Sequence, residues 1–142
     1  MEELKKRYLS AEKALNKLKE NIDLLASNNP DAIKYYEQFR GSAIQAFECG
    51  MDTLWKFIKE YLIKIEGMSF NAPTPKGVFR ESLAINLIDQ KEFESISEAI
   101  SDRNQTSHSY NELTAEKISK KLLDHYILMK KILDRIDNKK FN

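Results

Sequence analysis

The strongest constraint in this sequence is an apolar stripe with helical spacing near its start. Steps of four and three residues separate its members, which are Leu4, Tyr8, Ala11, Leu15, Leu18, Ile22 and Leu25. Lysine and glutamate fill the other faces, so the pattern predicts an amphipathic helix with one face against a core. Asn28, Asn29 and Pro30 should end this helix, because proline cannot continue it and asparagine suits a helix end or turn.

A second segment, residues 31–65, repeats the helical spacing and contains no proline. It therefore predicts one long helix that ends where a proline-containing loop, residues 67–76, begins. Thr74 and Pro75 close this loop. A threonine followed by a proline is typical of an N-cap and the first position of a helix, so another helix should start there.

The rest of the chain predicts two short helices and one longer final helix. Their apolar residues lie within 78–88, 93–100 and 115–136. A polar segment, residues 102–111, contains few helix formers and should break the helical run. Ser109 with Glu112 three residues later is a candidate capping box for the last helix. The tail from Asn138 is expected to fray.

The composition limits the fold to one helical domain. A chain of 142 residues is the size of a single domain, and four glycines and three prolines are few for a β-sandwich or barrel. With no convincing strand pattern, we predict an all-α fold over residues 1–142. It should be an antiparallel four-helix bundle in which one helical element is broken into short helices.

Composition also excludes several kinds of protein. The net charge of +1 does not indicate a general nucleic-acid binder. The single cysteine, Cys49, excludes an internal disulfide and a multi-cysteine zinc site. No signal-peptide core and no run of about 18 apolar residues occurs. We therefore expect a cytoplasmic protein with no metal and no cofactor.

The polar segment 102–111 is the first place where chemistry could reside. It gathers arginine, asparagine, histidine and tyrosine, which can act in acid–base or oxyanion chemistry. Arg103 and His108 are five residues apart, which is about 140° around a continuous helix. They would share a cleft only if the helix ended between them. The alternative is a solvated connection with one surface histidine.

Several motifs resemble those of one family. Arg103-Asn104 and His108 match the R-x(4–6)-H motif of the HEPN (higher eukaryote and prokaryote nucleotide-binding) superfamily, and Tyr110 extends it to the R-x4-H-x-Y form of HepT-type toxins. Within it, one branch is named nucleotidyltransferase substrate-binding proteins. Three segments resemble that branch, namely 47–62 (F-E…W-K-x-x-K-x-y-L), 74–81 (S-P-R-x-x-x-R-E) and 102–112 (D-R-N-x-x-S-H-x-Y-x-E). Lys76 and Asp52 depart from its usual arginine and glutamate but keep the charge.

The resemblance implies a dimeric helical bundle with two motif copies near the dimer axis. It also implies a metal-independent endoribonuclease toxin, paired with a small nucleotidyltransferase that attaches AMP to Tyr110. His108 would move protons, Arg103 would hold the phosphate, and Asn104 would orient the site or cap the helix. Arg80 and Ser107 are the remaining candidates for contacts with the substrate or the partner, and a plain surface ion pair is the alternative role of Arg80.

Two other functions remain open at this point. The branch name implies a non-catalytic subunit that presents substrate to the nucleotidyltransferase. The third possible function is that of a scaffold, formed by a HEPN dimer that has lost catalysis. The intact Arg103 and His108 pair favours the first function over the third, but a phosphate-binding arginine and histidine serve both of the first two.

Other residues allow both a functional and a structural interpretation. Trp55 could stack a base, although packing in the core or at a dimer interface is the more common role of such a residue. Glu48 and Asp52 share a helix face with no histidine nearby in sequence, which favours a solvated or arginine-paired face over a metal site. His125 and Cys49 are expected to be structural. The lysines of the last helix could attract RNA or merely solvate it; they are Lys117, Lys120, Lys121, Lys130, Lys131, Lys139 and Lys140.

Overall fold

The computed structural model of the chain describes residues 1–108, 111–136 and 138–141. These residues form helices and connections with no strand among them, which confirms the predicted all-α fold. The elements are α1 (Glu2–Ala26), α2 (Pro30–Lys34), α3 (Tyr36–Lys64), α4 (Pro75–Ala84), α5 (Gln90–His108), α6 (Glu112–Ser119), α7 (Leu122–Arg135) and the 3₁₀ turn η1 (Asn138–Lys140). None of the helices in the described ranges is long and apolar enough to cross a membrane.

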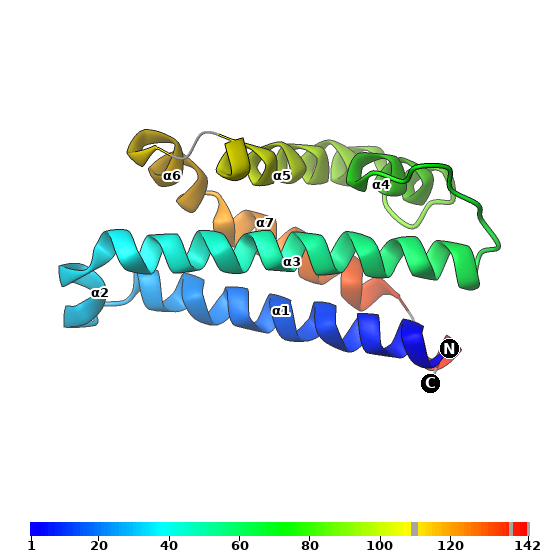
Figure 1. Cartoon of the computed structure of the whole chain (residues 1–142), viewed down its shortest axis with the longest axis horizontal. Helices are drawn as coiled ribbons and strands as arrows, with labels where there is room; N and C mark the ends of the chain where they lie inside the picture. The colour runs from blue at the N-terminus through cyan, green and yellow to red at the C-terminus, as the bar shows by residue number, and fades with distance from the viewer. Residues whose placement is uncertain (109–110, 137, 142) are drawn as a thin grey trace.

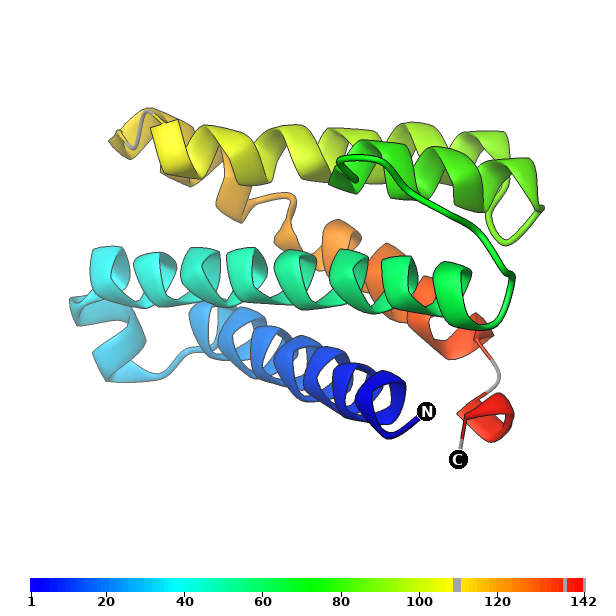
Figure 2. The same ribbon diagram turned by 45° about the vertical axis from the view of Figure 1, so that its right-hand side comes forward.

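Four helices form the body of the molecule and alternate in direction. In Figure 1, α1 runs antiparallel to α3 along its lower side, α5 lies on the opposite side of α3, and α7 passes behind. The pairs α1–α3, α1–α7, α3–α7, α3–α5 and α5–α7 all pack against each other. The turned view shows α4 lying along the first part of α5 (Figure 2). This arrangement is an up-down-up-down bundle.

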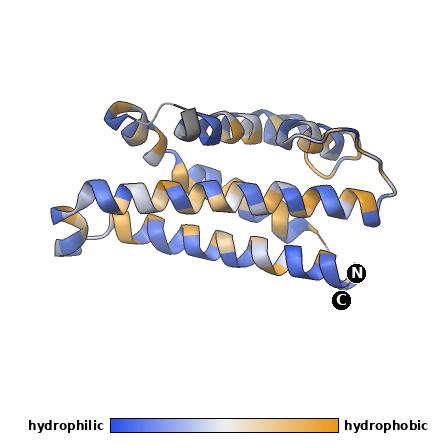
Figure 3. Cartoon of the chain, viewed as in Figure 1, coloured by the Kyte–Doolittle hydropathy of each residue, from blue (hydrophilic) through white to orange (hydrophobic). Residues whose placement is uncertain are grey.

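The core forms where the apolar stripes of these helices meet. Hydrophobic and hydrophilic residues alternate along every helix (Figure 3), as expected when one face is buried and the other is solvated. Phe47, Phe57 and Phe79 are among the largest fully buried side chains. Phe141 is only 3% exposed, and its ring lies 5.6 Å from that of Tyr8 and 5.8 Å from that of Phe57. The tail to this residue therefore packs against the core, so the prediction that it frays was wrong.

The segment predicted as one long helix is two helices. The backbone leaves helical geometry at Tyr35, with φ −114° and ψ 43°, and this separates α2 from α3. On a continuous helix Ala32 and Tyr36 would share one face. The break lets Ala32 be buried at the end of the bundle while the Tyr36 hydroxyl donates to Glu116 of α6 at 2.9 Å.

The connections around the proline-containing loop follow the predicted signals. Gly67 ends the turn after α3 with φ 72°, a left-handed conformation that glycine adopts without strain. The Thr74 side chain accepts a hydrogen bond from the Gly77 amide, and Pro75 is the first residue of α4, as predicted. The helix α4 ends earlier than expected, at Ala84, because Asn86 turns the chain with φ 62°.

The helix continues further into the polar segment than expected, and the break lies near the end of that segment. Helix α5 runs through residues 102–108, and Asn111 caps α6 by accepting from the Thr114 amide. The predicted capping residue Ser109 lies outside the described residues, and the cap is Asn111 instead. The predicted final helix is also divided, since α6 and α7 are separated at Lys120 and Lys121.

A reciprocal capping box fixes the start of α5. The Glu92 amide donates to the Asp89 carboxylate at 2.8 Å, and the Asp89 amide donates to the Glu92 carboxylate at 3.0 Å. Arg135, the last residue of α7, donates to both oxygens of Glu92 at 2.8 Å. These hydrogen bonds lower the pKa of Glu92 from 4.5 to about 2. One carboxylate therefore caps α5 and ties it to α7.

The lowered pKa of Glu92 predicts that part of the free energy of unfolding depends on pH. Because the folded-state pKa of Glu92 is below its unfolded value, its contribution is complete above about pH 4.5 and is lost as the pH falls toward 2. Glu92→Gln should reduce the free energy of unfolding by about 2–3 kcal/mol at pH 7, and this difference should shrink toward pH 2. Urea unfolding followed by circular dichroism across this range measures it. Glu94→Gln, an exposed change on the same helix, should show no such trend; a Glu92→Gln difference that stays constant with pH contradicts the assignment.

Candidate functional site

The sequence motif lies in the last two turns of α5, where this helix crosses α3. Arg103 reaches across to two carboxylates that lie one turn apart on α3. Its Nε donates to Oδ1 of Asp52 at 3.1 Å and its Nη2 donates to Oδ2 of Asp52 at 3.0 Å. Its Nη1 donates to Oε2 of Glu48 at 3.1 Å. The structure thus confirms that Glu48 and Asp52 form an arginine-paired face.

The forked contact with Asp52 holds the guanidinium in a defined plane. Its hydrogen bonds are the main reason that the pKa of Arg103 is raised, while partial burial acts in the opposite direction. Thr106 supports the same arrangement one turn later on α5. Its hydroxyl lies 2.8 Å from Oε2 of Glu48 and 2.7 Å from the carbonyl oxygen of Arg103. Arg103 is therefore charged and oriented, with about a fifth of its side chain exposed (22%).

Asp102, the residue before Arg103, points into the protein. Its side chain is buried, and its Oδ2 lies 2.7 Å from Nε2 of the equally buried His125 on α7. Because the carboxylate can only accept, His125 donates this hydrogen bond. Lys121 adds a second contact, with its ammonium 2.8 Å from the same oxygen. The His125 ring also stacks on Phe47 of α3, with the centroids 5.3 Å apart.

The contacts of Lys121 with the buried Asp102 carboxylate favour the charged form of Lys121. Partial burial acts to lower the pKa of Lys121, but its hydrogen bond and charge interaction with Asp102 outweigh this and raise it. Asp102, His125 and Lys121 therefore join α5 to α7 through a charged, hydrogen-bonded cluster. We name these three residues the Asp102 cluster.

The sequence motif indicates Arg103 and Asn104 but does not indicate that Asp102 pairs with His125. A sequence signal for it exists. Asp102 continues the apolar stripe of α5 three residues after Ala99, and His125 continues that of α7 between Leu122 and Met129. A polar residue on the buried stripe of each of two helices indicates a hydrogen-bonded pair in the core.

Arg103 and Asn104 also border a hollow of about 280 Å³ at the junction of α3, α4 and α5. Its other polar lining comes from Asp52 and Lys56, and its rings come from Trp55 and Pro75. The side chains of Met51 and Ile100, both buried, line it as well. This hollow brings an arginine, a lysine, an amide and an indole ring within reach of one small ligand.

The remaining predicted site residues lie elsewhere or outside the described part. The backbone of Ser107 and His108 belongs to α5, but their side chains lie outside what the structure describes, as does all of Tyr110. Arg80 lies on α4 with its guanidinium over the Phe93 ring, 6.0 Å from the centroid. Phe93 is ten residues before Arg103, about 15 Å along α5. Arg80 is not among the residues that line the hollow.

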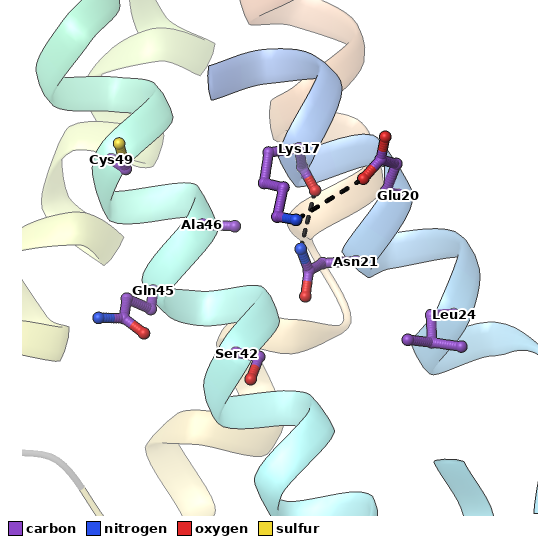
Figure 4. A pocket seen from close by; sticks show the side chains of 8 residues that line it. All are labelled: Lys17, Glu20, Asn21, Leu24, Ser42, Gln45, Ala46 and Cys49. Carbon is purple, nitrogen blue, oxygen red and sulfur yellow. Dashed lines mark hydrogen bonds and ion pairs between the residues drawn. The ribbon is translucent and has the colours of Figure 1, made fainter. Parts of the chain in front are cut away.

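A second hollow, of about 610 Å³, lies between α1 and α3 and contains none of the motif residues (Figure 4). Lys17 and Glu20 of α1 lie on one side, 3.9 Å apart, and the exposed Cys49 lies on the other. Its opposite charges are already paired, and no feature of the motif points into it. Among the residues that the structure describes, no group of three or more His, Cys, Asp or Glu side chains is placed to hold a metal ion.

The protein is an all-α antiparallel helical bundle in which an arginine is held on a pair of carboxylates. Comparison with known proteins gives its family. The chain belongs to the family described as nucleotidyltransferase substrate binding protein like, whose model matches residues 6–138. It is 35% identical to a Thermus thermophilus protein of known crystal structure, with a TM-score of 0.73 and coverage of 88% of this chain and 97% of that chain.

A second solved structure is a toxin–antitoxin crystallised with AMP-PNP. One of its chains matches with a TM-score of 0.73 over 94% of this chain and 97% of that chain, at 13% identity. At this identity the similarity is one of fold. No curated protein matches the sequence.

The Asp102 cluster predicts that a single isosteric substitution at Asp102 strongly reduces the stability. Asp102→Asn keeps the shape of the side chain but removes the charge that Lys121 and His125 face. We expect it to lower the free energy of unfolding by about 2–3 kcal/mol, because it breaks a buried, charge-assisted contact.

Glu98→Gln is the matched control for this prediction. Glu98 lies one turn earlier on α5, is 61% exposed and pairs with the same Lys121 at 3.5 Å. Its amide variant should cost less than about 0.5 kcal/mol. Equal costs for the two variants in urea unfolding would show that the Asp102 cluster does not hold α5 on α7.

Proposed function

We propose that this protein is a HEPN-type, metal-independent endoribonuclease, the toxin of a toxin–antitoxin pair whose antitoxin is a small nucleotidyltransferase. The observation that carries the proposal is the fixed guanidinium of Arg103. It lies at the rim of an accessible hollow, on the helix whose backbone continues to His108. Both RNA and a nucleotide-dependent partner occur in the cytoplasm, so the proposal assigns the protein to that compartment.

The chemistry needs few protein groups because RNA carries its own nucleophile. The 2′-oxygen attacks the adjacent phosphorus, its proton passes to a base, and the bond from phosphorus to the 5′-oxygen breaks as that oxygen receives a proton from an acid. Histidine can serve as both base and acid near neutral pH, which is the role proposed for His108. Arg103 stabilises the charge on the phosphorane, and Asn104 orients the phosphate.

The continuous helix favours a site shared between two copies of the chain. Positions 103 and 108 are about 140° apart around α5 and about 7.5 Å apart along it, so they do not share one face of the helix. A two-fold dimer that brings two copies of α5 together would supply a second His108, and thus separate groups for the base and the acid. We therefore propose a homodimer.

The family description supports a nucleotidyltransferase as the partner. In the proposal, this partner transfers AMP to Tyr110, two residues after His108. Each added phosphodiester brings a negative charge close to Arg103 and repels the RNA backbone. The partner can thus inactivate the toxin by a covalent change, without remaining bound to it.

The alternative is a non-catalytic subunit that binds substrate for the nucleotidyltransferase. The engagement of Arg103 with two carboxylates favours this function, because a guanidinium that is already paired is less able to stabilise the negative charge of a phosphorane. The family description points the same way. Cleavage of RNA distinguishes the two functions, since only the first requires it.

The first test is cleavage of single-stranded RNA in EDTA. Wild-type protein should cleave, and His108→Ala should reduce the rate by at least about a hundredfold, the usual effect of removing a general acid or base. Lys6→Ala, an exposed change on α1, should cleave at the wild-type rate. Equal cleavage by wild type and His108→Ala would rule out this site, and no cleavage by either would favour the binding subunit.

Mixed dimers test the shared site. When wild type and His108→Ala are unfolded and refolded together in equal amounts, about a quarter of the dimers hold two wild-type chains. If both copies of His108 are needed, the activity per wild-type chain should fall to about half. Independent sites would leave that activity unchanged.

The modification is tested by intact mass. Incubation with the partner nucleotidyltransferase and ATP should add one or more adenylyl groups to the wild-type protein and none to Tyr110→Phe. Tyr35→Phe, which removes an exposed tyrosine outside the motif at the start of α3, should be modified like the wild type. An adenylyl increment that persists in Tyr110→Phe would contradict the assignment.

A further inference from the structure

We infer that the hollow at Trp55, Pro75 and Asn104 is a subsite for one unpaired nucleobase, whose phosphate is held at Lys56 and Arg103. This inference deepens the proposed function by naming the part of the substrate that binds beside the motif. It rests on that proposal for the identity of the ligand and on the lining of the hollow for its chemistry.

The size and the walls of the hollow fit a small flat group. Its volume of about 280 Å³ is just below the range of sites for drug-sized ligands, and so suits a single nucleoside. Trp55 of α3 is half-buried, so part of its indole ring is held by packing and part remains accessible. Pro75, the first residue of α4, adds a second apolar ring. Aromatic rings bind bases of any sequence, because every base has a flat π-face.

The charges at the hollow favour a base that carries phosphate. Its lining holds one carboxylate, Asp52, and two cations, Lys56 and Arg103. Because Asp52 and Glu48 both pair with Arg103, Lys56 is the cation of this lining that a phosphate can reach without displacing a carboxylate. Lys59 lies outside the lining, with its ammonium 5.9 Å from the centroid of the Trp55 ring and 3.7 Å from the Glu60 carboxylate.

Asn104 supplies the group that can read a base edge. Its exposed amide offers both a donor and an acceptor, which is the pattern needed to bond the edge of an adenine or another base. His108 occupies the position four residues later on the same helix, so a strand that passes from the hollow along α5 leads toward the proposed catalytic residue. A paired base cannot enter such a site, which predicts single-stranded rather than duplex substrate.

The chain offers a direct reporter, since Trp55 is its only tryptophan. The experiment titrates the full-length protein with four probes and follows tryptophan fluorescence. The probes are a short unstructured 2′-O-methyl RNA, the same sequence as a duplex, AMP, and ribose 5-phosphate as the base-free control. The 2′-O-methyl group blocks the nucleophile, so binding is measured without cleavage.

We expect saturable quenching by the single strand, and none by the duplex or by ribose 5-phosphate. Quenching by AMP as well would support the same subsite with a free nucleotide as a second source of the base. Lys56→Ala should weaken binding about fivefold to tenfold, the effect of losing one phosphate contact. Lys6→Ala, which removes the same charge from α1, should leave the dissociation constant unchanged.

A second variant tests stacking without relying on the reporter. Trp55→Leu should weaken binding of a fluorescently labelled oligonucleotide about tenfold, as loss of one stacked base does. The subsite is overturned if the single strand and AMP both fail to quench, or if Lys56→Ala and Lys6→Ala bind equally. RNA cleavage without quenching would support the ribonuclease function and contradict the subsite. Quenching without cleavage of unmodified RNA would support the subsite and contradict the ribonuclease function.

Discussion

A buried carboxylate determines how the last turns of α5 sit on the bundle. Asp102 is 5% exposed, and a charge at this depth is tolerated only because His125 and Lys121 of the neighbouring helix segment meet it. Once Asp102 faces α7, the next residue lies about 100° further around α5, which places Arg103 toward α3. The orientation of Arg103 on Asp52 and Glu48 is therefore a geometric consequence of the Asp102 cluster. The stability of the bundle and the geometry of the site depend on adjacent residues of one helical turn.

The helices could be predicted wherever the apolar spacing was regular. They could not be predicted where tertiary contacts determine whether a helix continues or ends. The stripe of α1 and the Thr74 cap followed from the sequence because each depends on neighbours a few residues away. The continuation of α5 through residues 102–108 did not. Serine, asparagine and threonine cost a few tenths of a kcal/mol each in a helix, whereas one hydrogen bond to a charged group is worth about 1.5–3 kcal/mol. Contacts with α3 and α7 outweigh the local preference, and periodicity carries no information about them. The breaks at Tyr35 and Lys120 escape prediction for the same reason.

The site was predicted in part. The motif singled out Arg103 and Asn104, which border one hollow in the structure. The spacing of Glu48 and Asp52 favoured a solvated or arginine-paired face without saying which arginine it would be. The hollow could not be predicted, because it exists only where α3, α4 and α5 meet and its residues are up to 53 positions apart, from Met51 to Asn104. The partnership of Asp102 and His125 lay within reach, since both interrupt apolar stripes. Two polar interruptions must be considered together before either indicates a pair.

The carboxylates around Arg103 have a consequence for how ionic strength acts on this site. A cation on an open surface is accompanied by dissolved ions, and their release when a phosphate binds makes affinity fall steeply as salt rises. Arg103 instead has fixed counter-charges in Asp52 and Glu48. A phosphate that reaches this guanidinium exchanges with protein carboxylates and releases few dissolved ions. The steepness of the salt dependence of phosphate binding would then reflect Lys56 and not Arg103. Such binding would be less sensitive to ionic strength than the number of cations suggests.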